Sequence, residues 1–213
     1  MKTLALVSGI LLCSAAGPSV SHADTEAAPY PWLTVSSSRN FVFKMVPAKT
    51  RWDGERSVVE REPYGVAYKL EHDGNLKEIW RTRGWYAFDA HLSRDGRFLV
   101  RYGPWARDRK QRTDLAIAFY DRGVLVKQYR VKDLIRDPRL LEYSAGHYRW
   151  RAAVQTEPNG IQGNEVHLVL IDRTKYRFNL KTGEIVGVGR DEAARGFLAK
   201  FLEEEERDAK DDD

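Results

Sequence analysis

Short runs of apolar residues, many alternating with polar ones, are separated by glycine-containing turns along most of the chain between Trp32 and Val188. Aromatic and β-branched residues are enriched in these runs, which is typical of strands on a pleated, half-buried surface. Turn signals of the X-Gly type lie between them and supply the positive φ that tight hairpins require. The strands predicted in this way are Trp32–Val35, Phe41–Val46, Gly65–Leu70, Leu76–Trp80, Trp85–Leu92, Arg97–Tyr102, Leu115–Tyr120, Val124–Arg130, Tyr148–Val154, Glu165–Ile171, Tyr176–Leu180 and Ile185–Val188.

The predicted strands fall into three units, 32–81, 85–130 and 147–188, and each unit holds four strands. The first unit carries a charged insertion at Ala48–Glu62, and the third contains a long turn at Gln155–Asn164. Repeated four-stranded units at this period are typical of propeller blades, and the same hairpins can also build an open array or a sandwich. We therefore expect an all-β fold of mainly antiparallel hairpins, in about three four-stranded units, followed by one C-terminal α-helix.

One segment of the middle unit resembles a known family. Ser93–Val100 reads Ser-Arg-Asp-Gly-Arg-Phe-Leu-Val, which resembles the Ser-x-Asp-Gly-Arg turn and strand of TolB-like and WD40-like β-propellers. The resemblance extends over the repeat domain 32–188, whose other hairpins are similar to the outer strands of such blades. It implies degenerate blade-like units in this chain. Because four to eight blades usually close a propeller, three units leave closed, open and sandwich-like arrangements as alternatives.

Two segments have helical patterns. Val131–Asp137 predicts a short helix or turn that ends before Pro138. Near the C-terminus, apolar residues recur with helical spacing at Ala194, Phe197, Leu198, Phe201 and Leu202. We expect an amphipathic helix over 189–206 that packs this stripe on the β domain, with a partner or membrane surface as the alternative. An acidic tail over 207–213 follows it.

The N-terminus has the pattern of a secretory signal peptide over residues 1–23. One positive charge precedes an apolar stretch that ends at Ala16, and small residues occupy Ser21 and Ala23 before the expected cleavage. The apolar stretch is too short to span a bilayer, and an N-terminal anchor or a buried helix is the alternative. We expect a secreted or periplasmic protein, cleaved near Ala23, with a linker over 24–31 and no integral membrane span after cleavage.

Composition adds a separation of charge to this picture. The chain has 213 residues, with 35 Lys and Arg against 31 Asp and Glu, and a net charge of +4. Leu202–Asp213 holds eight acids and two bases, whereas 24–201 is basic. The single cysteine, Cys13, lies in the predicted signal peptide, which excludes a disulfide scaffold and a thiol nucleophile from the mature chain. The basic body would suit nucleic acid, but the predicted export disfavours that partner.

Catalytic signatures are absent from the sequence. It has no G-x-S-x-G nucleophile elbow, no H-E-x-x-H motif and no P-loop. The histidines of the mature chain lack metal-ligand spacing, so we predict no catalytic residue, no metal site and no cofactor. Among the carboxylates of the middle unit, Asp95 and Asp121 are expected to bond backbone N–H groups in turns, although two carboxylates held ~5–10 Å apart would permit glycoside hydrolysis. The carboxylates of the middle unit are Asp89, Asp95, Asp114 and Asp121.

A basic and aromatic loop is the best candidate for a binding site. The predicted binding residues, which follow Gly103 and Pro104, are Trp105, Arg107, Arg109, Lys110 and Arg112. Such a loop suits an acidic protein, a polyanionic envelope polymer or the acidic tail of the chain itself. The run His147–Arg151 alternates aromatic rings and basic residues. Trp side chains with Arg nearby are common at binding surfaces, and sugars stack on such rings. For each Trp, packing in the core is the alternative.

These features favour an exported, non-catalytic, β-rich binding or scaffold protein that presents the loops 103–112 and 155–164. A secreted hydrolase acting on a polysaccharide is one alternative, which would use the scattered carboxylates and exposed Trp side chains. An envelope assembly factor that docks through its acidic C-terminal tail is the other.

Overall fold

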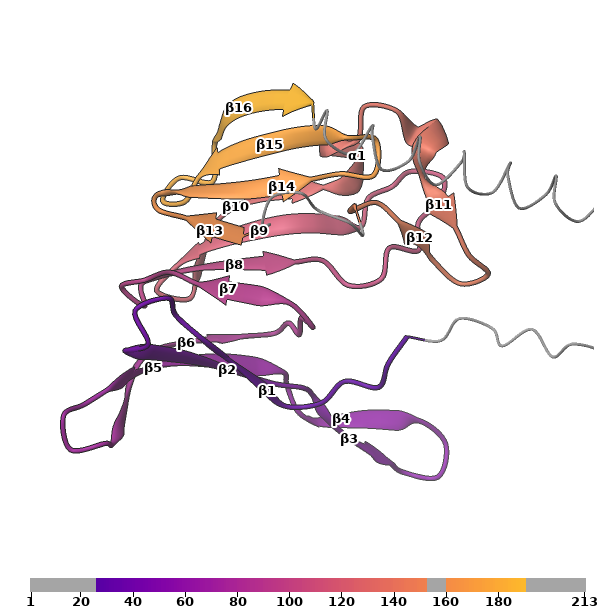
Figure 1. Cartoon of the computed structure of the whole chain (residues 1–213). Coiled ribbons are helices and arrows are strands. Elements are labelled where there is room, and N and C mark those ends of the chain that lie inside the picture. The colour runs from indigo at the N-terminus through magenta and orange to yellow at the C-terminus, as the bar shows by residue number, and fades with distance from the viewer. Residues whose placement is uncertain (1–25, 153–159, 191–213) are drawn as a thin grey trace, which may run out of the picture.

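The computed structural model describes residues 26–152 and 160–190 of the chain (Figure 1). These residues form mostly antiparallel strands with very little helix, which confirms the predicted fold class. The elements are β1 (Trp32–Val35), β2 (Phe41–Val46), β3 (Lys49–Trp52), β4 (Ser57–Arg61), β5 (Tyr64–Leu70), β6 (Leu76–Arg83), β7 (Ala90–Leu92), β8 (Phe98–Tyr102), β9 (Leu115–Asp121), β10 (Val124–Arg130), α1 (Val131–Leu134), the 3-10 helix η1 (Pro138–Leu140), β11 (Glu142–Tyr143), β12 (Tyr148–Arg149), β13 (Gly160–Gln162), β14 (Glu165–Val169), β15 (Thr174–Asn179) and β16 (Ile185–Arg190).

Three four-stranded antiparallel sheets contain most of these strands. The first sheet has the order β1-β2-β5-β6, the second β7-β8-β9-β10 and the third β13-β14-β15-β16. Two smaller ribbons, β3-β4 and β11-β12, accompany them. Each sheet is a meander in chain order apart from the β3-β4 insertion, so the three predicted units correspond to the three sheets.

The second sheet lies between the other two (Figure 1), and its central strands β8 and β9 are buried on both faces. Successive residues of a strand point to opposite faces, so Leu99 enters the cluster shared with the first sheet while Val100 enters the cluster shared with the third. Phe43 and Trp80 of the first sheet pack with centroids 5.7 Å apart in one cluster. The first strand of the second sheet, β7, also contacts the first strands of the other two, β1 and β13.

The third unit begins at a different strand from the one predicted. Tyr148–Val154 was expected to open it, but β12 pairs with β11, and the first strand of the third sheet is β13, inside the expected turn Gln155–Asn164. The apolar run was misleading because Tyr148 and Trp150 are buried in the cluster between the second and third sheets. Residues 150–152 bond to residues 169–171 at the end of β14 through a single isolated bridge, Arg151 with Leu170, and not as a strand of the third sheet. β13 has only three residues, one of them Gly160 at a φ of 117°, and so carries no alternating pattern.

Several element boundaries also differ from the prediction. The strand expected at Trp85–Leu92 is regular only from Ala90, because the aromatic residues before it pack in a loop. The strand expected to end at Val188 continues to Arg190, so the predicted helix 189–206 does not include residues 189 and 190.

Some predicted segments lie outside the described residues. These are the rest of the predicted C-terminal helix, the acidic tail 207–213, the signal peptide 1–23, residues 24–25 of the linker, and residues 153–159, which end the strand predicted at Tyr148–Val154 and begin the predicted loop 155–164. The short helix expected at Val131–Asp137 is present as α1, which is followed by η1.

The charged insertion Ala48–Glu62 forms a two-stranded ribbon, β3-β4, that was not predicted. Val46 at the end of β2 and Tyr64 at the start of β5 are direct partners, so residues 47–63 leave and re-enter the first sheet at one point. We call residues 47–63 the arm; it projects from the sheet (Figure 1), and none of its residues is buried. Trp52 is 67% exposed on it.

The segment 26–31, part of the predicted linker, lies along the second unit. The Glu26 carboxylate pairs with Arg107 at 2.7 Å, and the Tyr86 hydroxyl donates to the Tyr30 carbonyl at 2.8 Å. The Trp32 indole N–H donates to the Ala87 carbonyl at 2.8 Å. These partners lie 55–81 residues away along the sequence. Among the described residues, no helix is long and apolar enough to cross a membrane.

Candidate functional site

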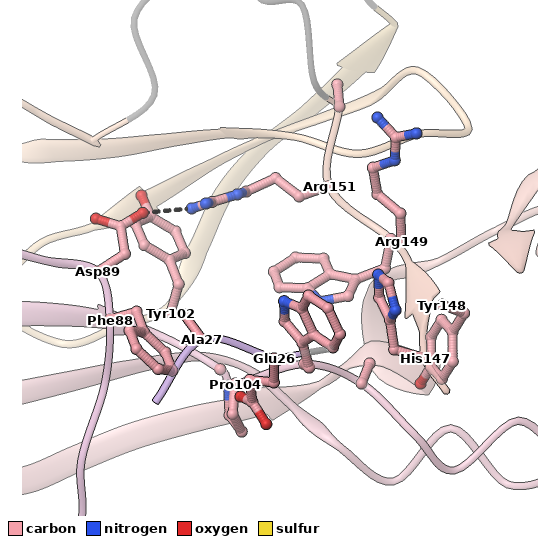
Figure 2. Close-up of a pocket in the computed structure, with 15 residues that line it drawn as sticks. Glu26, Ala27, Phe88, Asp89, Tyr102, Pro104, His147, Tyr148, Arg149 and Arg151 are labelled. Atoms are coloured by element: carbon pink, nitrogen blue, oxygen red, sulfur yellow. Dashed lines mark hydrogen bonds and ion pairs between the residues drawn. The ribbon is translucent and has the colours of Figure 1, made fainter. Parts of the chain in front are cut away.

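A pocket of about 590 Å³ lies where the second unit meets the segment that leads to the third sheet. It is lined by residues from four segments: 26–27, 88–89, 102–106 and 147–152. Figure 2 shows these side chains around the opening. The volume is in the range of small-ligand sites, so this pocket is the candidate functional site.

Strand pairing places two polar residues at the base of the pocket. Ala90 pairs with Arg101, so the residue before β7 lies beside the last residue of β8. The Tyr102 N–H accordingly donates to the Asp89 carbonyl at 3.1 Å. Because both residues stand at the ends of paired strands, their positions are fixed by the second sheet.

The Asp89 carboxylate forms an ion pair with Arg151 across the pocket. Arg151 Nη1 lies 2.7 Å from Asp89 Oδ2, and His91 Nε2 lies 3.4 Å from Oδ1 (Figure 2 shows the Arg151 contact). Partial burial raises the pKa of Asp89, but the hydrogen bonds from His91 and Arg151 outweigh it, and the pKa is lowered overall. Asp89 is therefore a carboxylate at neutral pH.

Tyr102 lies against this ion pair. The Arg151 guanidinium stacks over its ring at 4.5 Å, and the side chain is only 2% exposed. No described residue hydrogen-bonds its hydroxyl group. Burial raises the pKa of Tyr102, so the hydroxyl keeps its proton and is available as a donor.

Aromatic side chains form another part of the wall. Trp105 stacks on the His147 imidazole with centroids 3.8 Å apart, and Trp150 lies deeper at 6% exposure. Gly103 lies at the turn into this wall, so close to β9 that its N–H donates to the Ala116 carbonyl at 2.9 Å. A Cβ at residue 103 would lie 1.7 Å from the Leu115 carbonyl oxygen.

The charges that line the pocket balance one another. They are the acids Glu26 and Asp89 and the bases Arg149 and Arg151. Each also has an opposite charge next to it, since Glu26 pairs with Arg107 and Arg149 pairs with the Glu142 carboxylate. The pocket therefore presents polar groups without a net charge.

Of the predicted binding residues, Trp105 lines the pocket and the four bases do not. Arg107 reaches its edge through the pair with Glu26. Arg109 donates to the carbonyls of Ser144 and Ala145 and stacks over the Tyr143 ring at 5.6 Å. These two bases hold neighbouring segments in place.

The other two predicted bases lie further along the same loop. Lys110 is exposed, and Arg112 has a φ of 54° with a buried Nε that no described residue accepts from. The loop itself is ordered by Asp108, which accepts from the Thr113 hydroxyl and from the Gln111 N–H. The structure thus places the basic residues around a turn beside the pocket.

Asp114 connects this loop with the pocket wall. Its carboxylate accepts from the N–H groups of Arg107 and Asp108 at 3.0 and 2.8 Å and from the Tyr148 hydroxyl at 3.0 Å. Tyr148 in turn donates its N–H to the Ala106 carbonyl. The turn role predicted for Asp95 and Asp121 is present at Asp95, which accepts from the Arg97 N–H at 3.1 Å, whereas the Asp121 carboxylate pairs with the Arg97 side chain.

Sequence reasoning did not bring Asp89, Tyr102 and Arg151 together. Asp89 and Arg151 are 62 residues apart, and only the packing of segment 147–152 against the second unit places them side by side. The alternation of rings and bases over His147–Arg151 was the available signal, and that run does line the pocket. Within the described ranges there is no group of three or more His, Cys, Asp or Glu side chains placed to hold a metal ion.

No protein-family model matches this chain, and no curated protein matches it either. Function is therefore inferred from the pocket and the residues around it.

Proposed function

We propose that this chain is an exported, non-catalytic binding protein that holds a small polar ligand in the pocket beside the second sheet. The supporting observation is a preformed pocket lined both by aromatic rings and by the Asp89–Arg151 ion pair. Both ends of that pair stand on ordered backbone, which reduces the entropy lost on binding. Export rests on the signal peptide pattern of residues 1–23 and the expected cleavage near Ala23.

We also propose that the three sheets are blade-like units of an open, propeller-like array. The support is their common four-stranded meander and the contacts of β7 with both β1 and β13. The resemblance of Ser93–Val100 to the turns of TolB-like and WD40-like propellers points the same way.

Affinity capture tests the binding function. The tagged mature protein, its Trp105→Ala variant and the arm variant Trp52→Ala are each incubated with the native exported fraction of the source cells. We expect one species to be retained by the wild type and by Trp52→Ala but lost with Trp105→Ala, because Trp105 lines the pocket and Trp52 does not. Equal recovery with all three proteins would contradict a role for the pocket.

A hydrolase is the second candidate, because two carboxylates, Glu26 and Asp89, line the same pocket as Trp105. Glycoside hydrolysis needs one carboxyl group that stays protonated to act as the acid. The hydrogen bonds from His91 and Arg151 lower the pKa of Asp89, which opposes this role. Release of new reducing ends from oligosaccharides, lost in Asp89→Asn, would favour the hydrolase instead.

Docking through the acidic tail is the remaining alternative from the sequence, and the tail lies outside the described residues. A chain that ends at residue 202 tests it directly. If this truncation captures the same partners as the full chain, tail docking is contradicted. Loss of a basic partner protein with retained ligand capture would favour an assembly factor.

A further inference from the structure

We infer that the ligand of this pocket is a neutral saccharide, an inference that rests on the binding function proposed above. The ligand class follows from three independent properties of the pocket: its balanced charge, its aromatic wall and a buried hydroxyl group that no described residue hydrogen-bonds.

The balanced charge disfavours ionic ligands. An anion in the pocket meets Glu26 and Asp89, and a cation meets Arg149 and Arg151. Because each of these charges is already paired, an ionic ligand would have to displace a partner and lose its own hydration. A neutral ligand meets neither cost.

The aromatic wall and the ion pair suit a sugar ring. A pyranose has a C–H face that packs on an aromatic ring and a rim of hydroxyl groups, each both donor and acceptor. Trp105 and Trp150 supply rings, while Asp89 supplies acceptors and Arg151 supplies donors held 2.7 Å apart. A carboxylate beside a guanidinium can bind two adjacent hydroxyl groups at once.

The Tyr102 hydroxyl supplies the third argument. It belongs to a side chain that is 2% exposed and lines the pocket, yet no described residue bonds it. A buried hydroxyl without a partner is costly, so a site with this feature is suited to a ligand that supplies the missing hydrogen bond. A hydroxyl group of a sugar can accept it.

A charge series of trisaccharides tests the ligand class. The mature protein is titrated by calorimetry with α- and β-linked neutral hexose trimers, with the N-acetylglucosamine trimer, with its cationic de-acetylated form and with trigalacturonate. We expect at least one neutral trimer to bind ~10-fold or more tightly than both charged trimers. Binding of a charged trimer as tightly as the best neutral one, or of no trimer at all, would overturn the inference.

Two variants tie the binding to the pocket. Trp105→Ala should weaken the best neutral trimer by ~10-fold or more, whereas Trp52→Ala, which removes the exposed Trp of the arm, should leave it unchanged. Tyr102→Phe removes only the hydroxyl group. It should weaken binding by ~5-fold or more while the unliganded protein stays at least as stable as the wild type. Unchanged affinity in Tyr102→Phe would contradict the role given to the hydroxyl.

Native mass spectrometry of the protein isolated from its exported fraction separates this inference from the binding function. A bound molecule that is not a saccharide, and that is lost in Trp105→Ala, would overturn the saccharide and leave the binding function standing. If neither the titrations nor the isolated protein show a ligand that depends on Trp105, both proposals fail.

Discussion

Gly103 lacks a side chain at a position where the Leu115 backbone fills the space that a side chain would need. The turn it forms carries the chain from β8 into the pocket wall, where Trp105 follows two residues later. Trp105 could be selected from the sequence because it is a Trp in a predicted loop. Tyr102 could not, because it reads as an ordinary strand residue, and its unpartnered hydroxyl is a property of its three-dimensional surroundings.

For this single residue, we expect Gly103→Ala to lower the free energy of unfolding by about 3 kcal/mol. The added Cβ would lie 1.7 Å from the Leu115 carbonyl oxygen, and a backbone atom in a ladder cannot move aside easily. Urea unfolding measures the change. Gly189→Ala is the control, since nothing lies within 4 Å of its Cβ, and it should change stability by less than about 0.5 kcal/mol. Equal effects of the two substitutions would contradict the argument.

Asp108 gives a prediction about the stability of the fold at low pH. Hydrogen bonds from the Thr113 hydroxyl and the Gln111 N–H lower the pKa of Asp108 from 3.8 to about 2. A lowered pKa in the folded state means that the carboxylate stabilises the fold above about pH 4, and that this contribution is lost as the pH falls to about 2.

The variant Asp108→Asn should therefore be less stable than the wild type at neutral pH, and the difference should shrink as the pH falls from about 4 to about 2. Thermal unfolding of both proteins over this range measures the difference, and an NMR titration of the Asp108 carboxyl group gives the pKa itself. A stability difference that stays constant down to pH 2 would show that the carboxylate is not the stabilising group.

The arm illustrates how an element can be added to a sheet without changing it. β2 and β5 are neighbours in the first sheet, with Val46 opposite Tyr64, and residues 47–63 bridge two positions that a tight turn could join. The insertion could be recognised in the sequence by its many charged residues. Its two strands were not predicted, because these segments are rich in charged residues and lack the alternating apolar pattern of a strand. The central strands of the second sheet, β8 and β9, were predictable because continuous apolar runs are typical of strands buried on both faces.

Replacing residues 47–63 by Asn-Gly should therefore preserve the fold. Asn-Gly favours the two-residue turn that joins adjacent antiparallel strands. One backbone hydrogen bond, from the Gly84 N–H to the Pro63 carbonyl, would be lost, so we expect the free energy of unfolding to change by less than about 2 kcal/mol. Urea unfolding and the ligand titration described above measure the result. Loss of cooperative unfolding would show that the arm is required by the sheet.

At the scale of the molecule, the second sheet joins the other two by contributing to both apolar clusters. The three four-stranded sheets followed from the repeat of hairpins in the sequence, whereas the two-stranded ribbons β3-β4 and β11-β12 did not. Which strand opens the third sheet did not follow, because β13 is too short to show a period and the run at Tyr148–Trp150 is buried for other reasons. The pocket lined by residues 147–152 could not be predicted either, because local sequence patterns do not show which distant segments meet.

Because the second sheet is shared, we expect the three sheets to unfold in one transition. Phe43→Ala in the first sheet and Phe178→Ala in the third should each lower the free energy of unfolding by about 3–5 kcal/mol and shift the same transition, since both side chains are fully buried. Near-ultraviolet circular dichroism and Trp fluorescence, recorded on the same samples, measure it. Separate midpoints for the two signals in Phe178→Ala would show that the third sheet unfolds alone.

The contacts of the N-terminal segment bear on the time course of folding. Glu26, Tyr30 and Trp32 find their partners 55–81 residues later in the chain. The first part of the domain to emerge during synthesis must therefore wait for the second unit before it can dock, and contacts of such long range slow folding. In a protein exported as proposed here, this delay would keep the chain loosely structured during passage through a membrane channel, and the pocket edge formed by Glu26 would close only on the far side.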